Sequence, residues 1–537
     1  MVDVDSRALI DEGMAHHRAG RAPAAEKLYR QVLDRDPGNA EAHHLIGVLR
    51  FQEGKPQQAV VAFQHALAAG PENPKMLANL AAALLVLGRV EPAIEAFERA
   101  VVTAPETPEL LKNLGTAYRQ VNRLEDAAFV SERSVAFFPD DATAHANLAA
   151  VQLALGRHED ALASAEKAVA LNPEDPDALN TLGSALIVCR RLDDAIEALE
   201  RAVKSAPDLV EASRNLALAL QEACRYEEAA TQYEVVIEKW PEDASAHAGL
   251  GRTRRLQGRL ADAIVACREA VALNPSSSNY LSNLLFCLIG SPDQDGYSLK
   301  AEHLRWADRF APSARRREFS NSRDPDRRLR IGFVSPDFRD HPVGRIVGPV
   351  FATYDSEAVE IICYSNSVSL DQRGAAIAET VDQFVPVIGL SDKDVAGRII
   401  EDRIDVLVDL AGHTARSRLG VFALKPAPVQ ASWLGYMATT GLSAIDYVVG
   451  DPVHTPESFD GHFVEKVARL PRDLACFVAP DTAIAVAPLP AVQTGRITFG
   501  AFNNPGKMNE RVIALWASIL NDVTGSALLM RYAGCED

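Results

Sequence analysis

The stretch Ala40–Asn73 reads AEAHHLIGVLRFQEGKPQQAVVAFQHALAAGPEN, and its pattern recurs every 34 residues, eight times, from about residue 6 to residue 277. In each unit a small residue is followed twelve positions later by an alanine, and twelve positions after that by a proline. The small residues are Gly13, Gly47, Ala81, Gly115, Ala149, Gly183, Ala217 and Gly251; the alanines are Ala25, Ala59, Ala93, Ala127, Ala161, Ala195, Ala229 and Ala263; the prolines are Pro37, Pro71, Pro105, Pro139, Pro173, Pro207, Pro241 and Pro275. Small residues let helices approach closely and a proline stops a helix, so each unit is predicted to be a helix pair.

A 34-residue period with this pattern is typical of tetratricopeptide repeats, in which each unit is a helix–turn–helix. Such units stack on one another and bury a continuous core along the array. Residues 6–290 are therefore predicted to form an α-solenoid whose concave surface receives a protein or peptide partner.

One position of the first helix in each unit is occupied repeatedly by asparagine. The residues at this position are Asn79, Asn113, Asn147, Asn215 and Asn283. We call them the asparagine ladder. An amide side chain donates and accepts, so a row of them can hold an extended peptide backbone without reading its sequence. The alternative is that each asparagine bonds a neighbouring helix.

Composition and charge exclude several classes of function. The formal net charge is -18, which argues against a basic nucleic-acid surface. The N-terminal residues lack the pattern of a secretory signal, and no apolar run is long enough to cross a membrane. The seven cysteines are scattered without a CxxC pair, which is typical of a reducing compartment and argues against a cysteine metal site. We therefore expect a cytoplasmic protein that binds neither nucleic acid nor membrane.

The second half of the chain has a different sequence pattern. Residues 291–327 are predicted to be a connecting helix, Ser298–Phe310, and a polar linker that carries the arginines of 315–317. From residue 328 to 494, short apolar runs alternate with helical stretches, which predicts a doubly wound, parallel α/β domain. The predicted strands are Leu329–Val334, Val359–Tyr364, Val406–Leu410, Val429–Leu434 and Tyr447–Gly450, and the predicted helices are Gly344–Tyr354, Arg373–Val381 and Asp392–Asp402.

Ligands of such sheets bind beyond the carboxyl ends of the strands. Three loops follow predicted strands there: Ser335–Val343, Ala411–Arg418 and Gly435–Gly441. They bring histidines and carboxylates to successive strand ends, which favours a functional site over purely structural histidines. The sequence contains no Walker motif, GxGxxG or HExxH, so nucleotide hydrolysis, dinucleotide binding and zinc proteolysis have no support.

These loops, following tetratricopeptide repeats, resemble the O-GlcNAc transferase family, which includes the SPINDLY-type O-fucosyltransferases. The resemblance rests on Ile331–Phe338 with His341–Pro342, on Leu407–Thr414, on Phe422–Gln430 running into Trp433–Tyr436 and Thr440–Gly441, on Asp446–Tyr447 and Glu465–Lys466, and on Phe502–Asn504, Lys507 and Trp516. It covers essentially the whole chain. It implies two Rossmann-like lobes of the GT-B type, with the active cleft between them.

The resemblance implies an enzyme that transfers a sugar from a nucleotide sugar to Ser or Thr hydroxyls of bound proteins. The expected donor is UDP-GlcNAc, with GDP-fucose as the alternative, and no metal or other cofactor is expected. Residue by residue it implies catalytic roles for Asp337, His341 and His303, and donor contacts from Pro342, Val343, His413 and Leu434. Which group takes the hydroxyl proton stays open. Val343 departs from the threonine of the animal enzymes, and Met437 replaces a common proline.

Residues 495–537 are predicted to begin the second lobe. A complete Rossmann-like lobe needs more than roughly 100 residues, so we expect this lobe to be incomplete. On that expectation the chain binds acceptor peptides but transfers sugar poorly, binds UDP no tighter than millimolar and is trimmed by protease to near residue 490. A non-catalytic scaffold that holds partners with its repeats is the alternative function.

Overall fold

The computed structural model describes residues 4–311, 318–324, 326–367, 370–479 and 485–532, so the predicted arginines of 315–317 lie outside the described residues. The chain divides into two compact units, Met1–Ala206 and Pro207–Asp537. This division falls inside the repeat array. The predicted domain boundaries at 290, 327 and 494 follow the sequence pattern and stay predictions.

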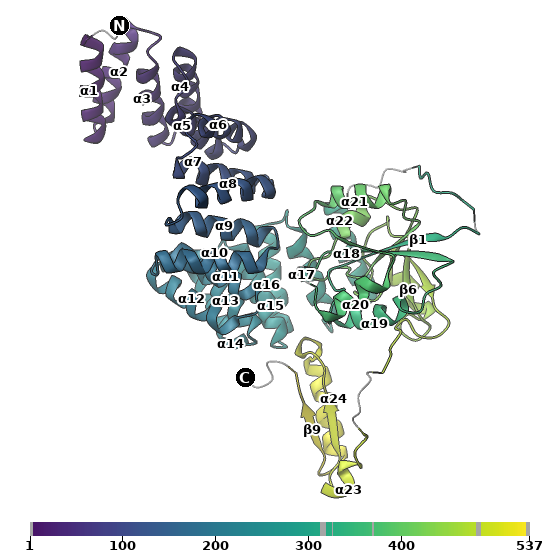
Figure 1. The fold of residues 1–537 in the computed structure, drawn as a ribbon. Helices are drawn as coiled ribbons and strands as arrows, with labels where there is room; N and C mark the ends of the chain where they lie inside the picture. Colours follow the sequence, from purple (N-terminus) through teal and green to yellow (C-terminus); the bar gives the residue numbers. More distant parts are fainter. Residues whose placement is uncertain (1–3, 312–317, 325, 368–369, 480–484, 533–537) are drawn as a thin grey trace. The chain divides into compact units, whose positions relative to one another are not determined.

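The described part of the first half is helical throughout, two helices to each predicted repeat (Figure 1). In the first unit the helices are α1 (Val4–Arg18), α2 (Ala22–Arg35), α3 (Ala40–Gln52), α4 (Pro56–Ala69), α5 (Pro74–Val86), α6 (Val90–Thr103), α7 (Pro108–Gln120), α8 (Leu124–Phe137), α9 (Ala142–Ala154), α10 (His158–Leu171), α11 (Pro176–Val188) and α12 (Leu192–Ser205). In the second unit they are α13 (Val210–Glu222), α14 (Tyr226–Lys239), α15 (Ala244–Leu256), α16 (Leu260–Leu273), α17 (Ser278–Ile289) and α18 (Gly296–Phe310).

The periodic residues pack as the pattern predicts. All eight periodic alanines are fully buried. A side chain at Gly47 would bring its Cβ within 2.5 Å of the Phe63 ring of the partner helix, and one at Gly183 within 2.4 Å of Leu199. Only a residue without a Cβ lets these helix pairs approach so closely. The predicted solenoid is confirmed.

The second unit contains a seven-stranded parallel sheet of order β3-β2-β1-β4-β5-β6-β7. The strands are β1 (Leu329–Ser335), β2 (Val359–Ser365), β3 (Gln383–Pro386), β4 (Val406–Asp409), β5 (Val429–Ser432), β6 (Tyr447–Gly450) and β7 (Lys466–Arg469). In the register of the central strands, Phe333 of β1 lies between Cys363 of β2 and Val408 of β4. The chain leaves β1 toward β2 and leaves β4 toward β5, so the strand order reverses between β1 and β4. Ligands of doubly wound sheets bind at such a switch point.

Two buried apolar clusters flank the sheet. One joins Phe333, Val347 and Phe351. The other joins Tyr364 and Leu407 with residues of α16, α17 and α18, including Trp306, so the last repeats share a core with the sheet. The helices between the strands are α19 (Pro342–Phe351), α20 (Gln372–Thr380), α21 (Asp392–Glu401), α22 (Leu419–Ala423) and the 3-10 turn η1 (Glu457–His462).

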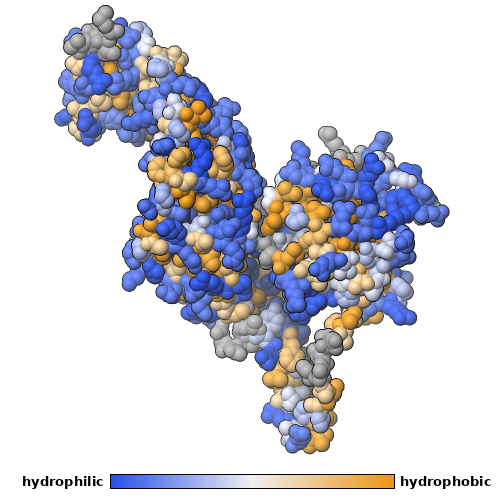
Figure 2. Space-filling model, in the orientation of Figure 1, coloured by the Kyte–Doolittle hydropathy of each residue, from blue (hydrophilic) through white to orange (hydrophobic). Residues whose placement is uncertain are grey.

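After the sheet comes a short strand–helix–strand segment. It consists of α23 (Pro490–Thr494), β8 (Thr498–Ala501), η2 (Pro505–Lys507), α24 (Glu510–Asp522) and β9 (Ala527–Met530), with β8 and β9 paired in parallel. Large apolar side chains of this segment are exposed, Ile513 and Leu515 of α24 by more than half. Figure 2 shows apolar residues over this segment, whereas hydrophilic residues cover most of the visible face of the repeats.

The predicted strands and helices of the sheet are confirmed to within three residues at each end, and the two strands that the prediction missed are β3 and β7. Both are edge strands of four residues, QFVP and KVAR, and their side chains are mostly half-exposed. An edge strand needs no continuous apolar run, so the apolar signal is absent there. No described helix is long and apolar enough to cross a membrane.

Candidate active site

The loop after β1 places Asp337 beside His341. Asp337 is 8% exposed, its backbone N–H donates to Ser335 Oγ at 3.0 Å, and Arg339 donates to its Oδ1 at 3.1 and 3.2 Å. His341 Nδ1 lies 3.6 Å from Asp337 Oδ2 and accepts a hydrogen bond from the Val343 N–H at 3.3 Å, so the ring caps the N-terminus of α19. The two predicted catalytic residues of this loop are therefore in contact.

The His341 ring is 36% exposed, and partial burial lowers its pKa despite the neighbouring Asp337. The ring is therefore neutral near pH 7. Because Nδ1 accepts from Val343, the proton of the neutral ring sits on Nε2. His341 thus offers an N–H donor at the N-terminus of a helix, where an anionic group is stabilised.

The loop folds back so tightly that a Cβ on Gly344 would lie 2.1 Å from the Arg339 carbonyl oxygen. Glycine at this position is what lets the helix start directly behind the loop. Of the two predicted donor contacts here, Pro342 is exposed, whereas Val343 is 5% exposed in the cluster on this face of the sheet.

The loop after β4 points its histidine inward. His413 is 1% exposed; its Nε2 lies 2.8 Å from the Thr440 carbonyl oxygen and its Nδ1 lies 3.1 Å from Ser282 Oγ of α17. A carbonyl only accepts, so Nε2 carries the proton and the serine hydroxyl donates to Nδ1. Burial lowers the pKa of His413 to about 3, so the ring is neutral.

Asp409 anchors the start of the same loop. It is 1% exposed and accepts from the backbone N–H groups of Ala411 and Gly412 at 3.1 and 2.8 Å, and from Ser432 Oγ at 3.1 Å. Burial raises the pKa of Asp409 to about 6.

His303 lies beside His413, with ring centroids 5.1 Å apart. It is fully buried; its Nδ1 donates to the Leu299 carbonyl at 2.6 Å, and its Nε2 accepts from the Tyr436 hydroxyl at 2.7 Å. Burial lowers the pKa of His303 to about 4. The structure thus brings two predicted residues together, but with both ring nitrogens of each occupied inside the protein. Their predicted contacts with substrate stay predictions.

The loop after β5 is fixed by hydrogen bonds to a buried carboxylate. Glu465 is 4% exposed and accepts from Thr439 Oγ1 at 2.6 Å, from the Thr440 N–H at 2.8 Å and from the Thr440 hydroxyl. Leu434, a predicted donor contact, has a φ of +66°, a left-handed conformation that costs a leucine free energy. A Cβ on Gly435 would lie 1.8 Å from the Leu410 carbonyl oxygen, so the chain passes directly over the end of β4.

A cavity of about 290 Å³ lies beside this loop. Its lining residues are Gly296, Leu299, Leu434, Tyr436, Met437, Ala438, Thr439, Val448, Val449, His454, Thr455, Phe459, His462, Phe463 and Leu474. His454 was not among the predicted site residues, although it lies four residues after the end of β6. The rule that located the other loops, polar residues after a strand's carboxyl end, would have found it.

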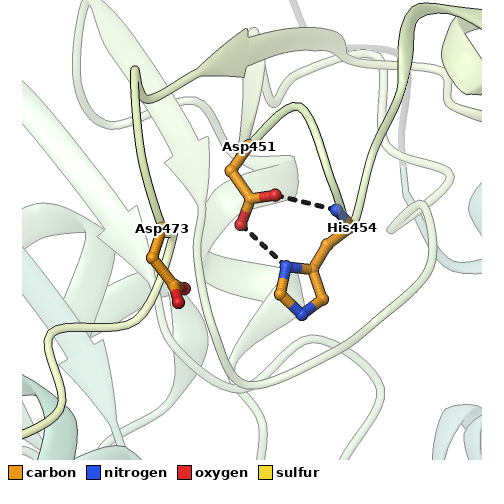
Figure 3. A group of neighbouring side chains, drawn as sticks. All are labelled: Asp451, His454 and Asp473. Atoms are coloured by element: carbon orange, nitrogen blue, oxygen red, sulfur yellow. Dashed lines mark hydrogen bonds and ion pairs between the residues drawn. The ribbon is translucent and has the colours of Figure 1, made fainter.

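A fourth polar group lies at the same edge of the sheet. Asp451, His454 and Asp473 approach within 4.8 Å of one another through one ligand atom each, a spacing at which three side chains can hold a metal ion (Figure 3). Asp451 already accepts four hydrogen bonds there, which leaves little room for a metal. The expected metal independence stays a prediction.

The asparagine ladder lies on the first helix of each repeat, as predicted. Asn113 is exposed, and the other four members are partly buried. Asn79 Nδ2 donates to Nε2 of the buried His44 at 2.8 Å, which is the alternative of a bond to a neighbouring helix. Peptide binding by the ladder stays a prediction.

Comparison with known proteins places this site in a family. The model of glycosyl transferase family 41 matches residues 313–485, which hold all three loops, and tetratricopeptide repeat models match between residues 10 and 278. A solved mutant of the Thermobaculum terrenum O-GlcNAc transferase is 33% identical, with a TM-score of 0.63; the match covers 67% of this chain and 69% of that one. The chain belongs to glycosyl transferase family 41. The fold predicted for the repeats and the first lobe is that of the family.

Curated members of the family align with shorter parts of the chain. A Petunia hybrida protein named probable UDP-N-acetylglucosamine–peptide N-acetylglucosaminyltransferase SPINDLY is 34% identical over 271 residues, which are 49% of this chain and 29% of that protein. A Caenorhabditis elegans UDP-N-acetylglucosamine–peptide N-acetylglucosaminyltransferase is 36% identical over 147 residues, 27% of this chain and 13% of that protein. The chain thus spans less than a third of the length of these relatives.

Proposed function

We propose that the chain belongs to a protein O-glycosyltransferase that moves N-acetylglucosamine from UDP-GlcNAc to Ser or Thr hydroxyls. The observation that carries this proposal is the family 41 match over residues 313–485, with Asp337 and His341 in contact at the switch point of its sheet. The names of the Thermobaculum, Petunia and Caenorhabditis relatives support the same sugar and a peptide acceptor.

In the proposed reaction the acceptor hydroxyl oxygen attacks the anomeric carbon, the bond from that carbon to the diphosphate breaks, UDP leaves with the electron pair, and the hydroxyl proton is released. The chain's own contribution is electrostatic. His341 donates from Nε2 to a donor oxygen, and the N-terminus of α19 adds its dipole. Because Asp337 lies within 3.6 Å of the ring, it favours any positive charge that the imidazole gains.

Protein acceptors are proposed to lie along the repeats, held by the exposed and half-exposed amides of the ladder. Binding there supplies acceptor affinity without contributing to the chemical step. No metal is proposed, because protein dipoles and cationic side chains can stabilise a leaving diphosphate without one.

The test is a transfer assay with radiolabelled UDP-GlcNAc and a Ser/Thr peptide, carried out on a version of the protein completed with a full second lobe. We expect His341→Ala to lower the rate at least tenfold, about 1.4 kcal/mol of transition-state stabilisation, without a fall in melting temperature. His65→Ala, at an exposed histidine of α4, is the control and should not change the rate.

A second arm replaces UDP-GlcNAc by GDP-fucose and measures binding of each by isothermal titration calorimetry. Preference for GDP-fucose would contradict the proposed sugar while leaving the family reaction intact. Transfer by His341→Ala at the wild-type rate, or loss of the fold in that variant, would contradict the catalytic role.

A further inference from the structure

The Asp451 carboxylate is fixed by its hydrogen bonds. It follows β6, is 1% exposed, and accepts from the backbone N–H groups of Val453, His454 and Leu474 at 2.8, 2.7 and 3.0 Å. A fourth bond joins its Oδ2 to Nδ1 of the His454 ring at 2.8 Å (Figure 3). Backbone N–H groups, first that of His454, hold the pKa of Asp451 well below its usual range, so it is an anion with no proton to give.

This anion decides the tautomer of His454. Since Asp451 has no proton, the hydrogen of the 2.8 Å bond belongs to Nδ1, so the neutral tautomer that this contact selects carries its lone pair on Nε2. The ring is held in one orientation by the buried carboxylate, the arrangement by which an aspartate orients a proton-accepting histidine. Nε2 has no hydrogen-bond partner among the described residues.

The same contacts weigh against a metal ion. Two carboxylate oxygens offer about four lone-pair positions, and the four N–H donors around Asp451 fill them. An ion held by Asp451, His454 and Asp473 would have to displace at least one of these bonds. The arrangement is instead that of a single hydrogen-bond acceptor on a fixed ring.

The His454 ring forms part of the wall of the 290 Å³ cavity, whose other walls are mainly apolar. Aliphatic and aromatic side chains contribute most of the lining, among them Leu299, Leu434, Val448 and Phe463. The volume lies just below the range for ligand pockets, about 300–1,000 Å³, so it fits a single ring. The left-handed backbone at Leu434 is a second sign that this wall is held in a special shape.

We propose that this cavity binds a small neutral ring with one hydroxyl group, a phenol, whose O–H donates to His454 Nε2 while its ring contacts the apolar walls. An anionic ligand is disfavoured because the Asp451 and Asp473 carboxylates face the imidazole. A sugar is disfavoured because its many hydroxyls would lose water against apolar walls without partners. The cavity shares Leu434 with the predicted donor contacts, but this proposal does not rest on the proposed transferase activity.

The phenol can be a free small molecule or a tyrosine side chain of a bound peptide. Two probes separate these sources: p-cresol, and N-acetyl-tyrosinamide, which carries the same phenol on a peptide backbone. Toluene is the matched probe without the hydroxyl. The His454 side chain is 48% exposed, so water can reach it in the free protein. A bound phenol replaces that water by its own hydroxyl, whereas bound toluene covers Nε2 and leaves the acceptor unpaired.

The experiment measures dissociation constants of the three probes by ligand-observed NMR with the full chain. We expect p-cresol to bind wild type at least tenfold more tightly than toluene. His454→Phe keeps a ring in place but removes the acceptor, so it should weaken p-cresol at least tenfold and leave toluene within twofold. His462→Phe, at the other histidine of the cavity wall, is the matched control and should leave p-cresol within threefold.

If His454→Phe fails to fold by circular dichroism, nitrogen-15 spectra of histidine-labelled wild type replace it: p-cresol should shift the His454 Nε2 resonance and toluene should not. Equal affinity for p-cresol and toluene, or unchanged p-cresol affinity in His454→Phe, would overturn the proposal. Zn²⁺ binding that is lost in His454→Phe would also overturn the proposal, because it would make the cluster a metal site.

The third probe separates the two sources of the phenol. If N-acetyl-tyrosinamide binds as tightly as p-cresol, the ligand is a tyrosine side chain. If p-cresol binds and N-acetyl-tyrosinamide does not, the ligand is a free phenol.

Discussion

At the scale of single residues, four histidines near one sheet differ because their surroundings differ. His303 and His413 are buried with both nitrogens bonded, His341 is half-buried at a helix start, and His454 is held by an anion. Burial disfavours the imidazolium, so the first two rings stay neutral through the physiological range. A histidine in a motif therefore has no fixed role until its partners are known.

The buried histidines predict a dependence of stability on pH. The folded-state pKa of His413 is about 3, below its unfolded value of about 6.5. Between these values the unfolded state binds more protons, so stability is full above about pH 6.5 and falls as the pH drops toward 3, by up to about 1.4 kcal/mol per pH unit. Asp409, whose pKa is raised to about 6, opposes this loss between about pH 6 and pH 4.

Because the two groups have opposite effects on the stability of wild type, the contribution of His413 is best seen by comparing a variant with wild type. His413→Gln should lose less stability than wild type between pH 6.5 and pH 5, by about 2 kcal/mol, because it removes one titrating ring. The measurement is hydrogen exchange of the β4–β5 region at the two pH values. His65→Gln, at an exposed histidine, is the control and should keep the wild-type dependence of stability on pH. If the stability of His413→Gln falls with pH as much as that of wild type, burial of His413 does not couple stability to pH.

At the scale of an element, hydrogen bonds to one buried carboxylate fix the conformation of the loop after β5. Glu465 fixes Thr439 and Thr440, and the adjoining Gly441 lies so close to α18 that a Cβ would come within 2.4 Å of the His303 carbonyl oxygen. The loop that carries Leu434 is thus tied to the helix that connects the repeats to the sheet.

Glu465→Gln should destabilise this loop. Hydrogen bonds to a charged group are worth roughly 1.5–3 kcal/mol each, and glutamine turns one of the accepting oxygens into a donor that faces other donors. We expect a fall of several degrees in melting temperature and faster exchange of residues 434–441. Glu457→Gln, an exposed carboxylate of η1, is the control, and an equal effect there would contradict the special place of Glu465.

The members of the asparagine ladder also differ at this scale, in their burial and in their hydrogen-bond partners. Asn79→Ala removes the donor to His44 and leaves a buried acceptor unpaired, which should cost about 1–3 kcal/mol and speed exchange in α3 and α5. Asn113→Ala, at an exposed member, should change local stability by no more than about 0.5 kcal/mol. If both substitutions leave exchange unchanged, the 2.8 Å bond to His44 contributes nothing to stability.

At the scale of the whole molecule, the proposed function places acceptor recognition and chemistry in different parts of the chain. The ladder lies on the repeats, and Asp337 and His341 lie on the loop after β1. A change in one part should then alter one kinetic constant without the other, because binding that is equal in ground and transition states affects KM alone.

Changing Asn113, Asn147 and Asn215 together to Ala should weaken binding of an unstructured acceptor peptide at least several-fold in fluorescence anisotropy. The affinity for the nucleotide should stay unchanged, and circular dichroism should show the fold intact. Wild-type peptide affinity in the triple variant would leave the ladder without a binding role, and a joint loss of nucleotide affinity would contradict the separation.

The sequence by itself determined the repeats, the parallel strands of the sheet interior and the position of the three loops. These follow from local rules: a 34-residue period fixes where helices pack, and apolar runs mark strands that are covered on both faces. The family could also be predicted from short motifs. Each motif lies within one loop at a strand end, so its residues can be recognised by their spacing in the sequence.

Only the tertiary structure decided which side chains point inward. His303 and His413 lie 110 positions apart in the sequence and 5.1 Å apart as rings, and no local pattern shows that both nitrogens of each ring have partners inside the protein. Glu465 was given no role for the same reason, since its partners Thr439 and Thr440 lie on another loop. Asp451 and His454 differ, because they are partners within one loop after β6 and the rule that located the other loops would have found them. Edge strands β3 and β7 gave no apolar signal because one side of each lacks a neighbouring strand. Burial and partnership are properties of distant contacts, and they set the charge, tautomer and access on which the chemistry of a site depends.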